Sequence, residues 1–233
     1  MANYVIVTAG GTGSRMHKHV PKQFISVNDE PIIMYTLKAF QEHPQIDGIV
    51  VPCLSGWDNY LETYSKMFGI TKLIKIVDCG DSGFRSIKNG LDYIYANCNK
   101  DDIVLIHDGN RPGVSAETIT NCINEIKEKG TAITYIPTNE VVYDISCNPP
   151  KLLNRDNIIR TQTPHGARLQ YMYDIYERAI KENCTDSVAF CSLLTKFNEP
   201  VNFVLGGEKN FKITYPDELD IFKGMVNKHD KNV

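Results

Sequence analysis

Short apolar runs alternate with longer amphipathic stretches through the first half of the chain. Five segments have the continuous apolar character of buried strands: residues 4–8, 48–52, 73–77, 103–107 and 131–136. Four segments between them carry apolar residues at helical spacing: residues 31–43, 57–68, 85–96 and 116–129. This alternation predicts an α/β fold with a mostly parallel, twisted sheet that helices cover on both faces.

The pattern changes at about residue 138. From 138 to 160 the chain holds Pro149 and Pro150, turn residues and short β-like pieces, but no long helical period. Such a stretch is too long for an ordinary connection, so we expect a β-arm within a single domain that spans 1–233. Beyond the arm the pattern predicts three helices and one strand: residues 169–182, 186–196 and 217–226, and residues 201–207.

Composition narrows the class of protein. A chain of 233 residues with 42% hydrophobic and 23% charged residues suits one soluble α/β domain. The net charge of -3 argues against a nucleic-acid partner, and no apolar run reaches the roughly 18 residues of a membrane span. The N-terminus lacks the basic, then apolar, pattern of a signal peptide. Seven scattered cysteines without a CxxC pair indicate reduced thiols, no zinc site and a cytoplasmic location.

The first predicted strand opens into a glycine-rich turn with nearby cations. The turn reads AGGTGSRM over residues 9–16, and PKQ follows at 21–23. Glycines let backbone N–H groups approach phosphate oxygens closely, and Arg15 and Lys22 supply the positive charge that a triphosphate needs. The turn matches neither the GxGxxG nor the GxxxxGK[ST] motif. A simple glycine turn beside two solvated cations is the alternative.

The fourth predicted strand ends in a second polar cluster, HDGNRP at residues 107–112. In parallel sheets ligands bind at the carboxyl ends of the strands, where Asp108 falls. A carboxylate there suits a Mg²⁺ ion that bridges phosphates, and the alternative is a helix N-cap. We interpret His107 as a structural residue bonded to the backbone.

Seven motifs follow one another along nearly the whole chain: AGGTGSRM…PKQF, Gly80-Asp81, Ser86-Ile87, HDGNRP, Gln162-Thr163-Pro164, Thr185-Asp186 and Phe211-Lys212-Ile213-Thr214. Together they resemble the CTP-dependent cytidylyltransferases that act on methylerythritol 4-phosphate and ribitol 5-phosphate. The resemblance implies a Rossmann-like fold of the nucleotide-diphospho-sugar transferase type. It also implies transfer of CMP from CTP to a small polyol phosphate, with Mg²⁺ as cofactor and pyrophosphate as product.

The resemblance also implies roles for individual residues. Three cations would act on the triphosphate and the transition state: Arg15, Lys22 and Lys212. Nucleotide contacts would come from Ala9, Gly10, Gly11, Gly13, Gly80, Asp81 and Ser86, and Ser86 would lie near the cytosine. A serine there is also an ordinary helix N-cap. Taken alone, Lys212 is more simply a solvated lysine at a strand end.

The acceptor side is implied in the same way. Contacts to the polyol phosphate would come from Asp108, Asn110, Arg111, Val141 and Arg155, with Asp108 also binding the metal. Arg155 would reach into the site of a partner subunit, which implies a homodimer with interlocked arms. An exposed loop arginine is the alternative for Arg155.

Several positions depart from the family pattern, mostly on the acceptor side. Asn110 replaces a small residue and would put an amide beside the acceptor, and Val141 replaces a threonine of the methylerythritol enzymes. Gly83 stands where an arginine is usual, with Arg85 two residues on, and His165 replaces a glutamine. These departures favour ribitol phosphate, glycerol phosphate or another short polyol phosphate over methylerythritol phosphate. A role in making surface polymers such as teichoic acid follows as a hypothesis.

Two further alternatives stay open. A sugar-1-phosphate nucleotidyltransferase would share the glycine turn, although PKQ and HDxxRP argue against it. A family member that only binds nucleotide would not need its cations, although all of them are present here.

Overall fold

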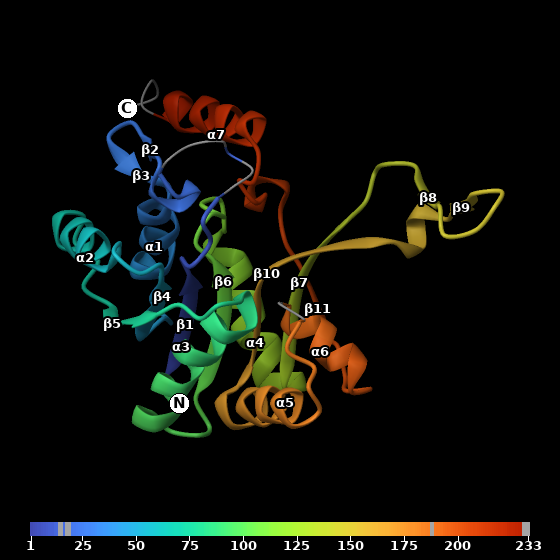
Figure 1. Cartoon of the computed structure of the whole chain (residues 1–233), viewed down its shortest axis with the longest axis horizontal. Helices are drawn as coiled ribbons and strands as arrows, with labels where there is room; N and C mark the ends of the chain where they lie inside the picture. The colour runs from blue at the N-terminus through green and yellow to red at the C-terminus, as the bar shows by residue number, and fades with distance from the viewer. Residues whose placement is uncertain (14–15, 17–19, 187–188, 230–233) are drawn as a thin grey trace.

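A mixed sheet forms the centre of the computed structural model, which describes residues 1–13, 16, 20–186 and 189–229 (Figure 1). Its seven strands lie in the order β11-β7-β10-β6-β1-β4-β5. They are β1 (Asn3–Thr8), β4 (Gly48–Cys53), β5 (Leu73–Asp78), β6 (Ile103–Asp108), β7 (Thr131–Pro137), β10 (Ile159–Arg168) and β11 (Phe203–Leu205). β10 pairs antiparallel with β6 and β7, and the other pairs are parallel. The predicted mostly parallel sheet is confirmed.

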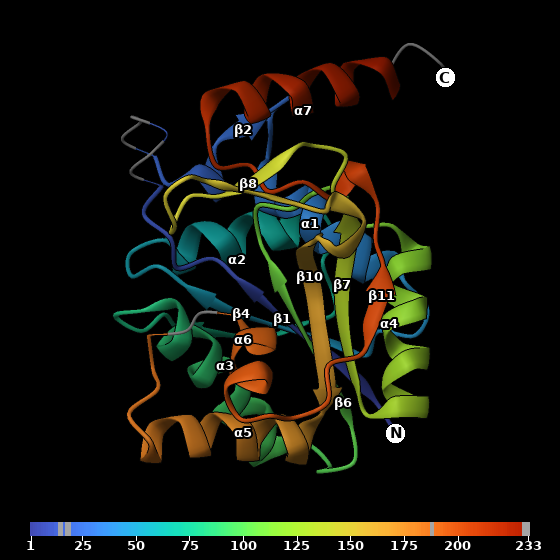
Figure 2. The ribbon, with the colours of Figure 1, turned by 90° about the vertical axis from the view of Figure 1, so that its right-hand side faces the viewer.

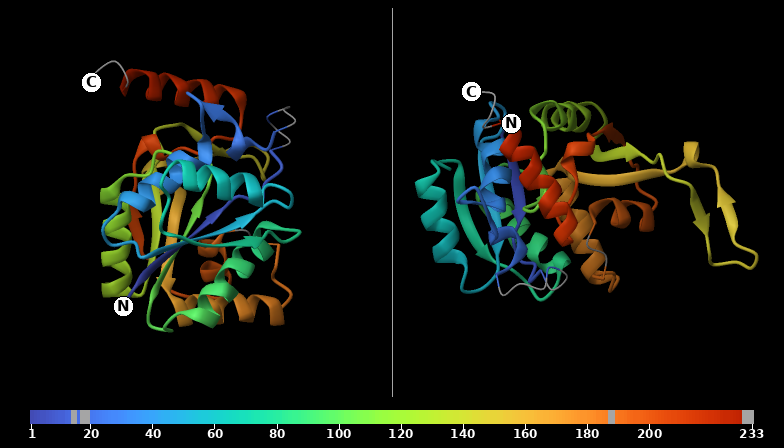
Figure 3. Two further views of the ribbon diagram at one scale, coloured as in Figure 1. Left: turned by 90° about the vertical axis from the view of Figure 1, so that its left-hand side faces the viewer. Right: turned by 90° about the horizontal axis from the view of Figure 1, so that it is seen from above.

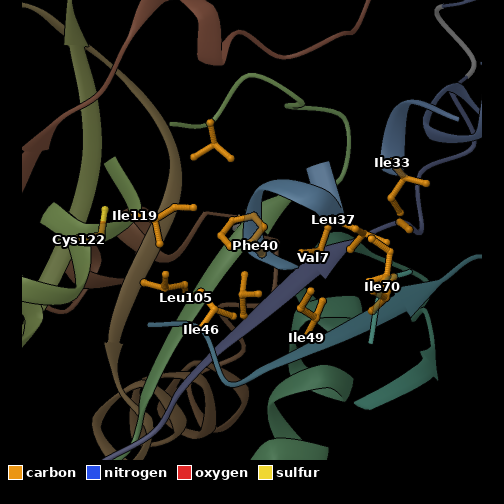
Figure 4. Packing of buried hydrophobic residues seen from close by; sticks show 14 of the residues in the cluster. Val7, Ile33, Leu37, Phe40, Ile46, Ile49, Ile70, Leu105, Ile119 and Cys122 are labelled. Carbon is orange, nitrogen blue, oxygen red and sulfur yellow. The ribbon is translucent and has the colours of Figure 1, made fainter. Parts of the chain in front are cut away.

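Helices cover both faces of this sheet, as predicted. They are α1 (Ile32–Glu42), α2 (Asp58–Met67), α3 (Gly83–Asn97), α4 (Ala116–Lys129), α5 (Leu169–Lys181), α6 (Phe190–Lys196) and α7 (Pro216–His229). Alternate strand residues point to opposite faces, so Val5 and Val7 join a core with α1 and α4 (Figure 4), while Ile6 joins a core with α3, α5 and α6. None of the helices in the described ranges combines the length and apolar character of a membrane span.

The five predicted strands and the first four predicted helices are confirmed, but β10 was not expected. Its ten residues, IRTQTPHGAR, lack an apolar run, yet β10 occupies a central place between β6 and β7. Its register shifts between Thr161 and His165. The last part of the chain also differs: α6 begins at Phe190, later than the predicted 186, and α7 extends to His229.

Between β7 and β10 the chain leaves the sheet and returns, where the sequence predicts an arm. The excursion carries a short antiparallel hairpin of β8 (Val142–Asp144) and β9 (Lys151–Leu153), followed by the 3-10 turn η3 (Arg155–Asn157). Seen from above, it projects well away from the rest of the molecule (Figure 3).

The C-terminal part of the chain passes over the carboxyl end of the sheet. After β11 it forms the 3-10 turn η4 (Glu208–Asn210) and then α7, which lies across the β2 (Ser26–Val27) and β3 (Glu30–Pro31) hairpin (Figure 2). Ile213, Leu219 and Phe222 pack there in a third apolar cluster with residues near the hairpin. This packing brings residues 211–214 beside the end of β6.

A glycine allows that close approach. A Cβ atom built on Gly113, in the loop after β6, would lie 1.9 Å from the carbonyl oxygen of Lys209 in η4. A side chain at this position would therefore push the C-terminal segment away from β6. A Cβ built on Gly207, at the start of η4, meets nothing within 4 Å.

We predict that Gly113→Ala destabilises the fold by about 1–3 kcal/mol, the usual cost of forcing extra atoms into a packed contact. Gly207→Ala is the matched control and should leave stability nearly unchanged. Urea unfolding of both variants measures the difference. Equal free energies of unfolding for the two variants would contradict the close contact between Gly113 and Lys209.

Candidate active site

A cavity of about 560 Å³ opens at the carboxyl ends of β1 and β6, on the edge that the sequence analysis assigned to a ligand. Ten of the predicted site residues line it: Gly10, Gly11, Lys22, Gly80, Asp81, Ser86, Asp108, Asn110, Arg111 and Lys212. Ala9 and Gly13 are not part of the lining, and Arg15 lies outside the described residues. Segments from the start, middle and end of the chain therefore meet at one cavity.

Gln23 holds the glycine turn in place through two hydrogen bonds. Its side-chain amide nitrogen donates to the carbonyl oxygens of Ala9 at 2.7 Å and Gly11 at 2.9 Å. Gly13 has a φ of 71°, and a Cβ there would lie 2.8 Å from the backbone nitrogen of Lys22. The turn thus packs directly against the 3-10 turn η2 (Lys22–Phe24). Sequence reasoning missed this supporting role of Gln23, although the residue belongs to the PKQ motif.

Asp108, at the end of β6, forms the electrostatic centre of the cavity. Its Oδ1 accepts from Nζ of Lys212 at 3.0 Å, and its Oδ2 accepts from Nε of Arg111 at 2.8 Å. Burial acts to raise the pKa of Asp108, but Lys212 and Arg111 outweigh it and hold the pKa well below its ordinary value. Asp108 is therefore an ionised carboxylate between two cations.

The helix-cap alternative for Asp108 is wrong. The next helix, α4, begins eight residues later, and its N-cap is Ser115, whose hydroxyl accepts from the backbone N–H of Thr118. The backbone N–H of Asp108 itself donates to the hydroxyl of Thr163 on β10. The carboxylate is thus left free of any cap role and faces the cavity with its two cations.

Asn110 lines the cavity as expected, but its side-chain amide bonds to the backbone of the C-terminal segment. Its side-chain amide nitrogen donates to the carbonyl oxygen of Ile213, and its own carbonyl oxygen accepts from the Ile213 N–H at 2.9 Å. The amide expected beside the acceptor therefore bonds to the backbone that follows Lys212. Asn110 ties the C-terminal segment to the end of β6. It therefore fixes the position of the Lys212 backbone beside Asp108.

Ser86 is also engaged differently from the expectation. The N-cap of α3 is Ser82, whose hydroxyl accepts from the N–H of Arg85, so the suggestion that Ser86 caps this helix is wrong. Ser86 lies in the first turn of α3, where its hydroxyl donates to the Ser82 carbonyl oxygen at 2.9 Å and accepts from the Gly80 N–H at 3.2 Å. It shapes the loop that carries Gly80 and Asp81.

Val141 and Arg155 lie on the arm and do not line the cavity of their own chain. Val141 is exposed, and Nη1 of Arg155 donates to the carbonyl oxygen of Asn139 at 3.3 Å within the arm. Neither residue meets Asp108 or Lys212 in one chain. Arg85, considered as a substitute for the missing arginine, is exposed and also absent from the lining.

His107 lies directly behind Asp108 and is fully buried. One ring nitrogen bonds to the carbonyl oxygen of Arg111 and the other to the hydroxyl of Thr163, each at 3.1 Å. Burial lowers the pKa of His107 to about 4, so the ring is neutral near pH 7. These bonds to backbone and hydroxyl agree with a structural role.

The structure adds cavity residues that the sequence analysis gave no role. They come mainly from β10 and the start of α6: Thr161, Gln162, Thr163, His165, Ala189 and Phe190. Gln162 and Thr163 belong to a family motif, and His165 is one of the departures from it. The sequence analysis assigned them no individual contacts, because β10 has no sequence signal of a strand.

Comparison with known proteins supports one family throughout. The family model described as 2-C-methyl-D-erythritol 4-phosphate cytidylyltransferase, IspD, matches residues 3–228. The chain is 35% identical over 229 residues to a ribitol-5-phosphate cytidylyltransferase of Lacticaseibacillus paracasei, covering 97% of this chain and 98% of that protein. It is also 35% identical over 227 residues to a 2-C-methyl-D-erythritol 4-phosphate cytidylyltransferase of Clostridium botulinum, covering 96% and 98%.

A solved structure agrees with these sequence relatives. The crystal structure of 2-C-methyl-D-erythritol 4-phosphate cytidylyltransferase from Francisella tularensis has a TM-score of 0.78 and 30% identity to this chain. The match covers 95% of this chain and 98% of that one. On the strength of the family model, the relatives and this fold, the chain belongs to the IspD family of cytidylyltransferases.

Proposed function

We propose that this protein transfers CMP from CTP to a short polyol phosphate, with ribitol 5-phosphate as the first candidate, and releases pyrophosphate. The observation that carries the proposal is the meeting of Asp108, Arg111 and Lys212 with the glycine turn in one cavity. The relatives named as cytidylyltransferases supply the reaction class. Both kinds of relative reach 35% identity, so methylerythritol 4-phosphate is the second candidate acceptor.

The reaction needs cations and orientation more than a protein nucleophile. An oxygen of the acceptor phosphate forms a bond to the α-phosphorus of CTP, and the bond from that phosphorus to the bridging oxygen of the leaving pyrophosphate breaks. The attacking phosphate is already an anion, so catalysis consists of holding two anions together and stabilising charge on the transferring group. We assign this work to Lys22 and Lys212, together with Arg15, and to backbone N–H groups of the glycine turn.

Lys212 is suited to act on the reacting phosphates. Its side chain is 40% exposed while its Nζ stays 3.0 Å from Asp108, so the ammonium group is both anchored and open to a ligand. Arg111 is held more tightly, because Nη1 also donates to the Asn210 carbonyl oxygen at 2.8 Å. Asp108 therefore positions two cations beside the substrate, and the Lys212 side chain is less restrained than that of Arg111.

Asp108 also fits a Mg²⁺ ion that binds together with the triphosphate. An ionised carboxylate offers about four acceptor sites, and Asp108 uses one on each oxygen for its cations. Within the described ranges no group of three His, Cys, Asp or Glu side chains forms a metal site by itself. The ion would thus be held by Asp108 and substrate phosphates, as is usual for Mg²⁺, and it would neutralise phosphate charge.

We also propose that the arm joins two copies of this chain. It exposes several large apolar side chains: Val141, Tyr143, Ile145 and Leu152. The hairpin has only three residue pairs, and an isolated two-stranded hairpin is marginally stable in water. A second copy would cover these side chains and would receive Arg155 in its site, as the family resemblance implies. We further propose a reducing, cytoplasmic setting, because the seven cysteines are scattered along the sequence without a CxxC pair.

We expect pyrophosphate release with CTP and Mg²⁺ to be fastest with one short polyol phosphate. The panel consists of ribitol 5-phosphate, glycerol 2- and 3-phosphates, arabinitol 5-phosphate and methylerythritol 4-phosphate. A clear preference for ribitol 5-phosphate would support the first candidate, and a preference for methylerythritol 4-phosphate would support the second. Binding of CTP without turnover on any acceptor would favour a protein that only binds nucleotide.

Lys212→Ala should lower kcat by about 100- to 1,000-fold, the typical effect of removing one group that stabilises transition-state charge. The affinity for CTP should change much less. Lys209→Ala is the matched control, because Lys209 is an exposed lysine three residues away on η4. Steady-state kinetics separate the two variants, and a similar loss in both would argue against a specific role for Lys212.

Two inactive variants should restore each other if Arg155 acts in the partner subunit. Co-expressed Arg155→Ala and Lys212→Ala chains would form mixed dimers in which one site has both residues intact. Random pairing gives roughly a quarter of wild-type activity in a two-fold dimer. The control pair, Lys22→Ala with Lys212→Ala, removes residues of the same subunit's site and should stay inactive. No recovery in the first pair would mean that Arg155 does not serve a partner's site.

A further inference from the structure

One buried polar atom at the cavity lacks a partner. Nε2 of His165 is buried without a hydrogen bond, and His165 lines the cavity. In the described part of the chain, six other residues have such atoms: Asn3, Glu30, Gln45, Ser65, Tyr176 and Asn210. None of these six lines the cavity. A buried polar atom without a partner destabilises the protein, so an unpaired atom on a side chain that lines a ligand cavity suggests that the ligand supplies the missing bond.

Two other buried histidines in the described ranges, His43 and His107, have ring nitrogens with hydrogen-bond partners. Nε2 of His43 bonds to the carbonyl oxygen of Ala116 and the hydroxyl of Thr120, at 3.2 and 3.0 Å. Both ring nitrogens of His107 have partners. His165 is only 4% exposed, yet it differs from both in leaving Nε2 unpaired.

The topology places His165 away from the glycine turn. His165 lies on β10 and is paired with Ile106 of β6, whereas the glycine turn follows β1 on the other side of β6. The cavity lining also includes the apolar residues Ile87, Ile106 and Phe190. The phosphate-binding cations, Lys22, Arg111 and Lys212, come from other segments. His165 therefore reaches the cavity from a different strand than the glycine turn and these cations.

The chemistry of the ring defines the missing partner further. A neutral imidazole has one donor and one acceptor nitrogen, whereas a hydroxyl group can both donate and accept. A hydroxyl group can therefore complete the hydrogen bond at Nε2 whichever ring nitrogen carries the proton. A polyol chain offers several such groups.

We propose that His165 helps to determine acceptor specificity, through a hydrogen bond between Nε2 and one hydroxyl of the polyol chain. The inference rests on the proposed function and concerns the same cavity. A small number of precisely placed polar groups usually fixes the orientation of a small ligand in its site. A site built to bond a hydroxyl discriminates strongly against an acceptor that lacks it, because the buried atom is then left unpaired.

The test combines two variants with acceptors that lack single hydroxyl groups. His165→Phe removes the unpaired nitrogen and should lower kcat/KM for the preferred polyol phosphate by about 10- to 100-fold, with the KM for CTP within about twofold of wild type. His165→Gln keeps a hydrogen-bonding side chain and should recover part of the loss. For the deoxy acceptor that lacks the bonded hydroxyl, wild type and His165→Phe should have nearly equal kcat/KM.

A matched control and three outcomes keep the inference falsifiable. His43→Gln changes a buried histidine far from the cavity and should leave kcat/KM for the acceptor unchanged, and thermal unfolding checks that each variant is folded. An equal loss for the full and every deoxy acceptor would overturn the inference in favour of a packing role. A raised KM for CTP alone would overturn it in favour of a nucleotide contact. A wild-type chain without turnover on any acceptor would overturn the proposed function itself.

Discussion

The carboxylate of Asp108 and the two cations that neutralise it set the requirements for the rest of the site. A charged group at the end of a buried strand needs partners, and Lys212 is 104 residues away in the sequence. The chain meets this requirement by passing its C-terminal segment over the end of β6. Gly113 permits the close approach, and Asn110 bonds to both the N–H and the carbonyl oxygen of Ile213. Farther along the chain, α7 packs onto the β2–β3 hairpin. The stability of the C-terminal helix and the geometry of the site are therefore parts of one arrangement.

Local patterns in the sequence predict most of the frame. The first five strands of the sheet and their helices have either continuous apolar runs or a clear helical period, and both signals come from burial. β10 has neither signal, because residues such as Thr163 and His165 serve the cavity instead of an apolar core. Its pairing with β6 and β7 comes from the surrounding sheet. β10, the strand of the seven-stranded sheet that the sequence did not predict, is thus a strand that carries cavity residues.

The sequence predicts which residues form the candidate site, but it does not predict the contacts that they make. Motif order pointed to Lys22, Asp108 and Lys212, and the structure brings them to one cavity. The hydrogen bonds of Asn110 and Ser86 go to backbone groups whose positions depend on loop geometry, which periodicity does not encode. Val141 and Arg155 lie on the arm, outside the lining of their own chain's cavity.

The strand β10 has a consequence that reaches beyond one subunit. One end of it continues into the arm, and its middle forms a wall of the cavity with Thr163 and His165. In the proposed dimer, the same short strand would connect the contact between subunits with the bound acceptor. Linkage is reciprocal, so a ligand that binds better in the dimer must tighten the dimer by the same factor. Substrate concentration would then help to govern how much of the protein is assembled.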